Sequence, residues 1–385
     1  MIAKSIILFL VLILLPQLWI DWQVLRRRAK SRRLFCWLPT IIIVGYTIYL
    51  ALLPNWVPDN YLLLEVWYLM MGIVVIPQAV FALCSLVGLP WYRKRHARHN
   101  PGAFVGVVLG LFAAGSFLYG LYCGFGKLEV RHVTLSCEGL PDAFDGYRIV
   151  HVSDAHVGTF QGIREWMLAR DVDSINAQRP DLLLFTGDLQ NFSPHDVVPH
   201  LATLRRMKAP DGVISILGNH DYGKYADVSL AEKRAIEREI VAQERGLGWT
   251  VLRNSFQVVK RENDSIVVAG EEYDTERDDP YKEDIRRLSQ KIDPRSFLIM
   301  LEHTPDAWEE RVLPYTNARV QLSGHTHGGQ VSVFGYRVTQ PSYKHDYGLA
   351  EQDGRYLYTT SGLGGVVPLR LGVWAEIVVI TLKKS

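Results

Sequence analysis

Four long apolar runs fill the first third of the chain, at residues 2–20, 34–53, 61–90 and 103–125. Each run approaches or exceeds the length of about 20 residues that an α-helix needs to cross a bilayer. Buried helices of a water-soluble protein are the alternative, but four runs with almost no charge inside them are atypical of such helices. The pattern therefore predicts an all-α anchor of four transmembrane helices over residues 1–126.

The pattern changes beyond Gly126, where short apolar or alternating runs take turns with amphipathic stretches. Period-two and short apolar runs predict strands at 128–135, 147–152, 182–186, 213–217, 297–301, 319–322 and 375–382. Helical spacing predicts helices at 163–178, 196–207 and 230–245, and charge density predicts a solvated surface excursion at 271–291. This alternation of strands and helices is typical of an α/β domain, here residues 127–385.

Charge is divided unevenly between these two regions. Residues 1–126 carry 11 basic and three acidic side chains, a net charge of +8, whereas residues 127–385 carry 31 basic and 37 acidic side chains, a net charge of −6. The acidic region argues against a nucleic-acid-binding protein, which would carry a basic face. The basic region is mostly hydrocarbon with its charge in short clusters, which is typical of a membrane protein.

The basic clusters predict how the anchor is oriented. They lie at residues 26–33 and 93–98, whereas the loop at 54–60 contains no Lys or Arg. Because positively charged loops stay on the cytoplasmic side, the fourth run would lead residues 127–385 to the extracytoplasmic side of the cell membrane. The first run lacks the A-x-A-like site of a cleaved signal peptide, so a multi-pass membrane protein is predicted.

Polar side chains follow five of the predicted strands, at the point where each strand ends. In chain order they are Asp154 and His156, then Asp188, then Asn219, His220 and Asp221, then His303, and finally His325 and His327. Ligands of open α/β sheets bind at the carboxyl ends of strands, and the glycines beside these residues permit sharp turns. Each motif alone is explained equally well by a turn or a loop cap, but their recurrence at five strand ends predicts one shared ligand site.

This ordered set of motifs resembles the calcineurin-like metallophosphoesterases. The resemblance is carried by Asp154-x-His156, Gly187-Asp188, Gly218-Asn219-His220-Asp221, His303 and Gly324-His325-x-His327, and it covers residues 127–385. The extension of the last motif to Gln330 and the closing Pro368-Leu-Arg370 resemble the membrane-anchored bacterial branch of the family. The resemblance implies a four-layer αββα sandwich with a dimetal site at the edge of its two sheets.

The resemblance also implies a ligand set for two divalent metal ions. One ion would be bound by Asp154, His156 and His327, the second by Asn219, His303 and His325, and Asp188 would bridge both. Carboxylate, imidazole and amide ligands without a thiolate suit Mn, Fe or Zn better than Mg, and the chain contains no C-x-x-C spacing. Two divalent ions about 3.5–4 Å apart can clamp both in-line oxygens of a phosphoryl transfer.

Three further residues receive roles from the resemblance. His220 would face the scissile phosphate and act as a general acid, Asp221 would orient His220, and Arg370 would contribute to phosphate binding. No ligand of the family pattern is missing from the sequence, and hydrolytic activity is therefore expected.

The motifs and the anchor together predict a membrane-anchored dimetal phosphohydrolase that cleaves a phosphoester or pyrophosphate bond. Because the anchor places the site beside the lipid bilayer, a phosphorylated, lipid-linked or amphiphilic substrate is favoured, and no nucleic acid is expected as a partner. The alternatives are the UDP-diacylglucosamine pyrophosphohydrolase of lipid A synthesis, whose step is cytoplasmic, and a non-catalytic membrane sensor with the same fold. A transporter is disfavoured because Glu65 is the one acidic residue inside the predicted spans.

Overall fold

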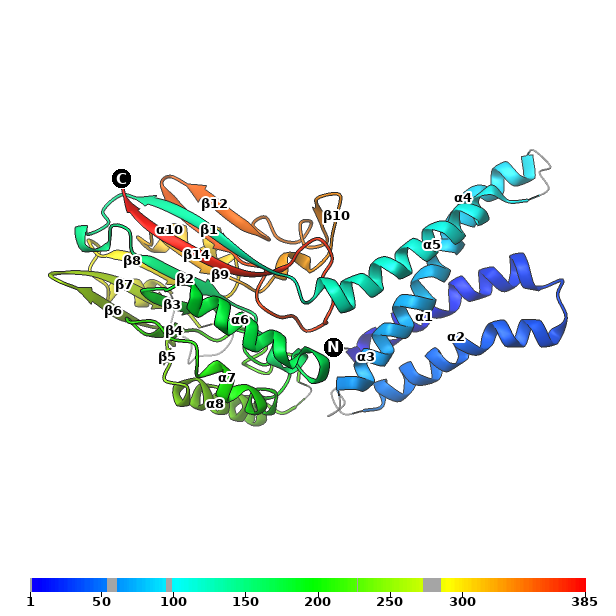
Figure 1. The fold of residues 1–385 in the computed structure, drawn as a ribbon, viewed down its shortest axis with the longest axis horizontal. Coiled ribbons are helices and arrows are strands. Elements are labelled where there is room, and N and C mark those ends of the chain that lie inside the picture. Colours follow the sequence, from blue (N-terminus) through cyan, green and yellow to red (C-terminus); the bar gives the residue numbers. More distant parts are fainter. Residues whose placement is uncertain (1, 54–60, 95–98, 227, 273–284) are drawn as a thin grey trace. The chain divides into compact units, whose positions relative to one another are not determined.

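The computed structural model describes residues 2–53, 61–94, 99–226, 228–272 and 285–385 (Figure 1). Contacts divide the chain into two compact units, Met1–Cys123 and Gly124–Ser385. The boundary between residues 126 and 127 that the sequence suggests stays a prediction. The loop at 54–60 and the end of the second basic cluster, at 95–98, lie outside the described residues.

The first unit is all-α, with turns between its helices, over its described residues. It contains α1 (Ile2–Ile20), α2 (Lys30–Ala51), α3 (Tyr61–Met70), α4 (Ile76–Lys94) and α5 (Pro101–Tyr119), extended or joined by the π-helical turns η1 (Asp21–Leu25), η3 (Met71–Val75) and η4 (Gly120–Gly124). Four stretches are long and apolar enough to cross a membrane, at Ile6–Leu25, Lys30–Ala51, Leu62–Lys94 and Pro101–Gly124. The four predicted apolar helices are therefore confirmed.

A stripe of glycines lets α5 lie directly on α4. A Cβ atom added to Gly102 would stand 2.0 Å from the backbone oxygen of Cys84, and one added to Gly106 would stand 2.9 Å from the Cα of Phe81. Such small-xxx-small stripes bring two helices into close contact where water cannot drive their association, as in a bilayer.

Two six-stranded sheets form the framework of the second unit. The first has the order β1 (Leu128–Cys137), β14 (Ala375–Lys384), β2 (Arg148–Val152), β3 (Leu182–Phe185), β4 (Val213–Ser215) and β5 (Thr250–Val251). The second has the order β12 (Gly348–Gln352), β13 (Arg355–Thr359), β9 (Val320–Ser323), β8 (Phe297–Leu301), β7 (Asp264–Gly270) and β6 (Ser255–Arg261). A separate hairpin is formed by β10 (Ser332–Val333) and β11 (Tyr336–Arg337).

The central strands of both sheets run parallel. Strands β2, β3, β4 and β5 pair in parallel in the first sheet, and β7, β8, β9 and β13 do so in the second. Strands buried on both faces read as continuous apolar runs, and all residues of β3 and β8 are indeed buried. Parallel pairing places the loops that follow β2, β3 and β4 at the same edge of the first sheet. It likewise places the loops that follow β8 and β9 at the same edge of the second sheet.

Three apolar cores stack these elements into four layers. The two sheets face each other across a core that includes Ile149 and Leu184 from the first sheet and Ile299 and Leu322 from the second. Helices α6 (Glu165–Ala177), α7 (Leu201–Leu204) and α8 (Leu230–Gly246) cover the first sheet, and α9 (Ile285–Gln290) with η10 (Trp308–Val312) and α10 (Leu313–Tyr315) covers the second. The predicted αββα sandwich is confirmed.

Two local predictions are wrong. The helix expected at 196–207 is helical only over α7, preceded by the short 3₁₀ turns η8 (Pro194–Asp196) and η9 (Val198–His200), because Pro199 offers no N–H to continue a longer helix. The segment 271–291 is not solvated throughout its described part, since Glu271, Ile285 and Leu288 are buried.

Candidate metal centre

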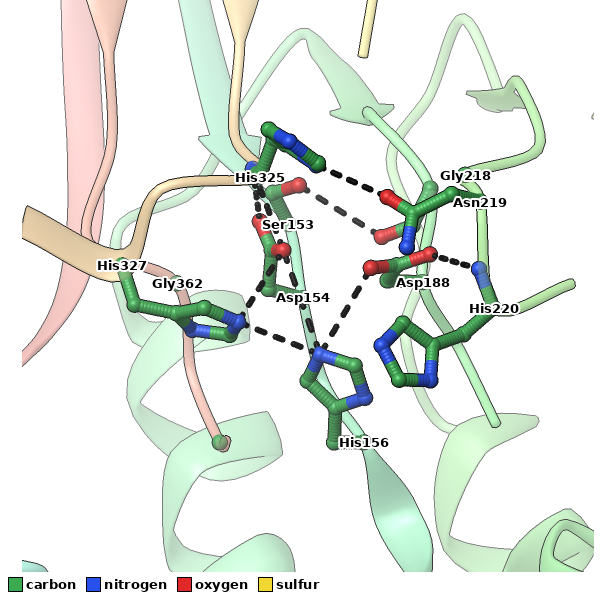
Figure 2. A network of polar contacts seen from close by, with 12 residues as sticks. Ser153, Asp154, His156, Asp188, Gly218, Asn219, His220, His325, His327 and Gly362 are labelled. Atoms are coloured by element: carbon green, nitrogen blue, oxygen red, sulfur yellow. Dashed lines mark hydrogen bonds and ion pairs between the residues drawn. The ribbon is translucent and has the colours of Figure 1, made fainter. Parts of the chain in front are cut away.

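The loops after β2, β3, β4, β8 and β9 carry all of the predicted metal ligands. Five of these residues have a left-handed backbone: Asp154 (φ 49°), His156 (φ 41°), Asp188 (φ 59°), His325 (φ 72°) and His327 (φ 53°). Non-glycine residues rarely adopt positive φ values, and such strain clusters at functional sites. The backbone thus bends sharply at these positions and turns their side chains toward a common centre (Figure 2).

Two glycines let neighbouring loops lie against the two carboxylates of the centre. A Cβ atom on Gly324 would stand 2.0 Å from Oδ2 of Asp154, and one on Gly218 would stand 2.2 Å from Oδ1 of Asp188. Any side chain at either position would push its carboxylate out of place, which gives both glycines a function in the site.

The first group of ligand atoms comes from Asp154, His156 and His327. Nε2 of His327 lies 3.5 Å from Oδ1 of Asp154 and 3.2 Å from Nε2 of His156. These three side chains offer atoms that all lie within 4.8 Å of one another, which is close enough to share one ion.

The second group gathers around the side-chain amide of Asn219. Its Oδ1 lies 3.0 Å from Nε2 of His303 and 2.7 Å from Nδ1 of His325. Asp188 lies between the two groups, because its Oδ2 is 3.6 Å from Nε2 of His156 and 3.3 Å from Nε2 of His303. The structure thus brings the seven predicted ligands together around one centre.

The backbone of the strand ends fixes the orientation of the imidazole rings. Nδ1 of His156 donates to the carbonyl oxygen of Gln190 (3.1 Å), and Nδ1 of His303 donates to the carbonyl oxygen of Thr186 (2.7 Å). Since a carbonyl oxygen can only accept, Nδ1 carries the proton in both rings and Nε2 is left to face the centre.

Burial sets the charge state of the centre. Desolvation lowers the pKa of His156 and of His325 to about 3, so both rings are neutral and keep a lone pair. Burial raises the pKa of Asp154 to about 7. Burial also disfavours the charge of Asp188, but the histidines around it, above all His303, hold its pKa well below the usual value.

These groups fit divalent metal ions. Burial alone would lower the pKa of His303, but the negative charge of Asp188 raises it to about 10. The His303 ring is therefore protonated, and its positive charge balances the carboxylate of Asp188. A metal ion would replace that proton and would also satisfy the facing Nε2 atoms of His156 and His327, of which only one can carry a hydrogen. Carboxylate, amide and imidazole groups are ligands that divalent metal ions accept.

His220 stands beside the two groups. Its ring centroid lies 4.7 Å from that of His156, and its backbone N–H donates to Oδ1 of Asp188 (2.8 Å). Nδ1 of His220 donates to the carbonyl oxygen of Asn191, which leaves Nε2 for other partners. His156, Asp188 and His220 also form a group of close ligand atoms. Metal content and leaving-group dependence of a His220 variant therefore distinguish a general acid from a metal ligand.

The partners of the Asp221 carboxylate in the structure are backbone groups rather than the His220 ring. Oδ2 of Asp221 accepts the backbone N–H groups of Asp188 (2.7 Å) and Gly218 (2.9 Å), and its Oδ1 accepts those of Leu189 (3.0 Å) and Gln190 (3.3 Å). The buried carboxylate therefore ties the loop after β3 to the loop after β4 and positions Asp188, whereas the His220 ring is held by a carbonyl oxygen.

Asp221→Asn is expected to lower the free energy of unfolding by about 3 kcal/mol and to weaken metal binding together with it. The substituted amide keeps the size of the carboxylate but turns an NH₂ group toward two backbone donors, whichever way it is oriented. Denaturant unfolding and metal content measure the two effects. Asp173→Asn, at an exposed carboxylate on α6, is the matched control, and unchanged metal content in Asp221→Asn would contradict the positioning role.

Arg370 also departs from its expected role. Its side chain is fully buried, and Nη2 donates to the carbonyl oxygens of Ser361 (2.7 Å), Gly362 (3.1 Å) and Gly364 (2.6 Å). Burial lowers the pKa of Arg370 to about 10. Because Nη2 already donates to three carbonyl groups, the Arg370 side chain holds the 361–364 loop in place. The structure does not support a direct contact between Arg370 and a phosphate.

Two residues near the centre escaped the sequence analysis. The hydroxyl of Tyr343 lies 3.1 Å from Nε2 of His325. The other ring nitrogen of His325, Nδ1, faces Oδ1 of Asn219. The side-chain amide of Asn191 is buried, and neither of its polar atoms has a hydrogen-bond partner among the described residues. The Asn191 position follows Gly187-Asp188 by three residues, but nothing in the sequence pattern distinguishes it from a loop residue.

Comparisons with known proteins match two separate parts of the chain. A family model described as calcineurin-like phosphoesterase matches residues 147–329, and one described as probable calcineurin-like phosphoesterase, transmembrane domain, matches residues 3–125. An uncharacterized metallophosphoesterase of Bacillus subtilis is 32% identical over 296 residues, which cover 74% of this chain and 96% of the relative.

Two further relatives extend the similarity. An uncharacterized metallophosphoesterase of Aquifex aeolicus is 26% identical, with 73% of this chain and 98% of the relative covered. A transmembrane protein with metallophosphoesterase domain from Danio rerio is 28% identical, with 80% of this chain and 70% of the relative covered. The name of the Danio rerio protein describes it as a transmembrane protein.

Proposed function

The chain belongs to the calcineurin-like phosphoesterase family, and we propose that it hydrolyses a phosphoester or pyrophosphate bond in a lipid-linked or amphiphilic substrate. It is a membrane-associated, metal-dependent phosphoric ester hydrolase. The observation that carries the proposed substrate class is the short connection between anchor and hydrolase. The fourth candidate span ends at Gly124, and β1 begins at Leu128, so the hydrolase unit is joined directly to a span whose end lies at the lipid headgroups.

We further propose that the centre holds two divalent ions. Asp154, His156 and His327 would hold one ion, Asn219, His303 and His325 would hold the other, and Asp188 would contact both, as the distances around its Oδ2 support. When bound, the ions supply Lewis-acid activation of the phosphoryl group and of the attacking water. The backbone contacts of His156 and His303 keep their rings in place for this role.

The proposed role of His220 is to donate a proton to the departing oxygen. Its Nδ1 is engaged by the carbonyl oxygen of Asn191, so the donating atom is Nε2. The side chain is only 8% exposed, which limits competition by bulk water for this proton. The unpaired amide of Asn191 lies on the residue whose carbonyl oxygen holds the ring, and we assign it to the substrate phosphate as a hydrogen-bond donor.

The hydrolase unit is proposed to lie on the extracytoplasmic side. Support comes from the basic cluster at 26–33, which follows the first candidate span, and from the second cluster that begins at Arg93. A reporter enzyme fused after Ser385 is expected to be active outside the cytoplasm. Activity of the fusion confined to the cytoplasm would contradict this orientation.

Substrate profiling of the full chain in vesicles tests the proposed substrate class. Phosphorylated lipids in phosphatidylcholine vesicles are compared with nucleotides and nitrophenyl phosphoesters in solution, each with Mn²⁺, Zn²⁺ or Mg²⁺ supplied. The proposal predicts a higher kcat/KM for at least one lipid than for every nucleotide with the same type of bond. The Asp188→Ala protein is the control for contaminating phosphatases. Turnover of nucleotides and aryl esters without turnover of any lipid would contradict the proposal.

A further inference from the structure

The β10–β11 hairpin presents large apolar side chains to solvent. Phe334 is fully exposed at its tip, and Val333 and Tyr336 on either side are more than half exposed. Phe334 and Gly335 have φ values of 53° and 82°, which is the turn type that favours Asn or Gly at the first position. A bulky aromatic residue is unfavourable there, so the sequence accepts strain to place this ring at the tip.

A second exposed apolar pair lies where α6 begins. Ile163, in the short turn η7 (Gly162–Arg164), is 67% exposed, and Trp166, in the first turn of α6, is 57% exposed. We name Ile163, Trp166, Val333, Phe334 and Tyr336 together the apolar patch. Water-soluble surfaces tolerate single exposed residues of this kind, but the three large ones that gather on the hairpin mark an interaction surface.

Both parts of the patch are joined to the residues at which the chain leaves its fourth candidate span. That span ends at Gly124, where an added Cβ would stand 2.0 Å from the backbone oxygen of Arg370. The next residue, Leu371, accepts the backbone N–H of Ser332 (2.7 Å) and so ties the start of the hairpin to this position.

The connection to α6 runs through the next two residues of the chain. The ring of Phe125 lies 5.7 Å from that of Phe160, and Nη1 of Arg170 donates to the carbonyl oxygen of Gly126 (2.6 Å). The beginning of α6 is thus fixed beside Phe125 and Gly126. Because a chain that leaves a transmembrane helix at Gly124 is still at the bilayer surface, the elements attached to residues 124–126 are held at that surface too.

The patch borders the metal centre as well. The turn η11 (His327–Gly329) carries a predicted ligand and is followed closely by β10. A Cβ on Gly329 would stand 2.7 Å from Cγ2 of Val338, just beyond β11, and Tyr343 in the same segment contacts His325. A partner that binds the hairpin therefore lies beside the segment that carries His327 and contacts His325.

We propose that the apolar patch inserts into the interface of the lipid bilayer and seats the metal centre against the lipid headgroups. The inference rests on the proposed function and adds the surface by which a bilayer-borne substrate is met. Trp and Tyr favour the headgroup region, and Phe, Val and Ile favour the acyl boundary below it, which matches the composition of the patch. The bilayer is the occupant we propose because both parts of the patch are tied to residues 124–126, which follow directly on the fourth candidate span.

Quenching by nitroxide-labelled lipids tests this insertion in the full chain. Cys36, Cys84, Cys123 and Cys137 are replaced by Ala, and a fluorophore sensitive to polarity is attached to Phe334→Cys or, in a second variant, to Tyr336→Cys. Val258→Cys is the matched control, because Val258 is an exposed apolar residue of β6, at the opposite end of this unit from β10 (Figure 1).

In vesicles of phosphatidylcholine and phosphatidylglycerol, both hairpin labels are expected to shift their emission to shorter wavelength. Both are also expected to lose most of it to lipids with nitroxide on the acyl chain, whereas the label at Val258→Cys keeps its emission. Hairpin labels that remain in a polar environment and are quenched no more than the control would overturn the proposal.

Hydrolysis separates this inference from the proposed function. The Phe334→Ser/Tyr336→Ser protein is expected to lose about tenfold in kcat/KM on a vesicle-borne phosphorylated lipid, because burial of one Phe side chain alone accounts for such a factor. Its rate on dissolved nitrophenyl phosphate should be unchanged, as should both rates of Val258→Ser. Equal losses on both substrates would overturn the docking role. Strong quenching without turnover of any lipid would uphold insertion and reject the proposed substrate class.

Discussion

Asp188→Ala is expected to lose its bound metal and to lower hydrolysis by about a thousandfold or more. The carboxylate lies between the two groups of ligands, with Oδ2 3.6 Å from Nε2 of His156 and 3.3 Å from Nε2 of His303. The neighbouring carboxylate of Asp154 lies farther from His156, with its Oδ1 4.0 Å from Nε2 of that ring. Loss of several kcal/mol of charge stabilisation at a metal centre corresponds to a rate effect of this size.

Metal content per chain and turnover of nitrophenyl phosphate check this expectation in the same preparation. Asp171→Ala is the matched control, since Asp171 is also buried but lies on α6 and pairs with Arg170. The control should retain metal and activity where it folds. An Asp188→Ala protein that binds as much metal as the wild type and turns over would contradict the assignment of Asp188 to both ions.

His220→Asn is expected to keep the metal and to lose activity according to the leaving group. General acid catalysis contributes roughly 10²–10⁴-fold, and it matters most for a poor leaving group such as an alkoxide. An alkyl phosphoester should therefore suffer most of that loss, whereas a nitrophenyl ester, whose phenolate leaves without a proton, should lose much less. The carbonyl oxygen of Asn191 leaves Nε2 of His220 for this proton transfer.

Asn219→Ala provides the contrast within the same tetrapeptide. The amide oxygen of Asn219 contacts His303 and His325, so its removal should weaken metal binding and slow both esters together. A leaving-group series, metal content and melting temperature are measured for both variants. Loss of metal in His220→Asn would instead make His220 a ligand, as its proximity to His156 and Asp188 permits.

The fold was predictable where one residue pattern had one physical explanation. Fully buried strands such as β3 and β8 read as short apolar runs, and α8 was marked by its amphipathic spacing. The β12–β13 hairpin was missed although Asp353-Gly354, with φ values of 53° and 71°, is a typical hairpin turn. The turn signal was present there, but β12 is too polar to stand out as an apolar run.

The candidate site divides in a similar way. Ligand side chains such as Asp154 and His327 were recognisable because their residue types recur at strand ends. The carbonyl oxygens of Thr186 and Gln190 that orient the histidines were not, because every residue carries a carbonyl group and only the folded backbone aims it. For the same reason the backbone N–H groups that donate to Asp221 could not be predicted from the sequence.

Arg370 shows the opposite error, in which a residue type suggested more than its environment allows. Arginine often binds phosphate, but the three carbonyl oxygens around Nη2 of Arg370 are backbone groups of a single loop. The sequence records that a cation is present and does not record what already surrounds it.

Metal titration of the full chain in vesicles tests whether hydrolysis of a phosphorylated lipid depends on two bound ions. Protein stripped with a chelator is supplied with Mn²⁺ or Zn²⁺ in measured amounts, and bound metal and hydrolysis of a phosphorylated lipid in the same vesicles are recorded together. The stripped protein is expected to be inactive, and activity is expected to rise to its maximum as two ions bind per chain. Full activity in the stripped protein, or two bound ions without hydrolysis of any phosphorylated lipid, would contradict this expectation.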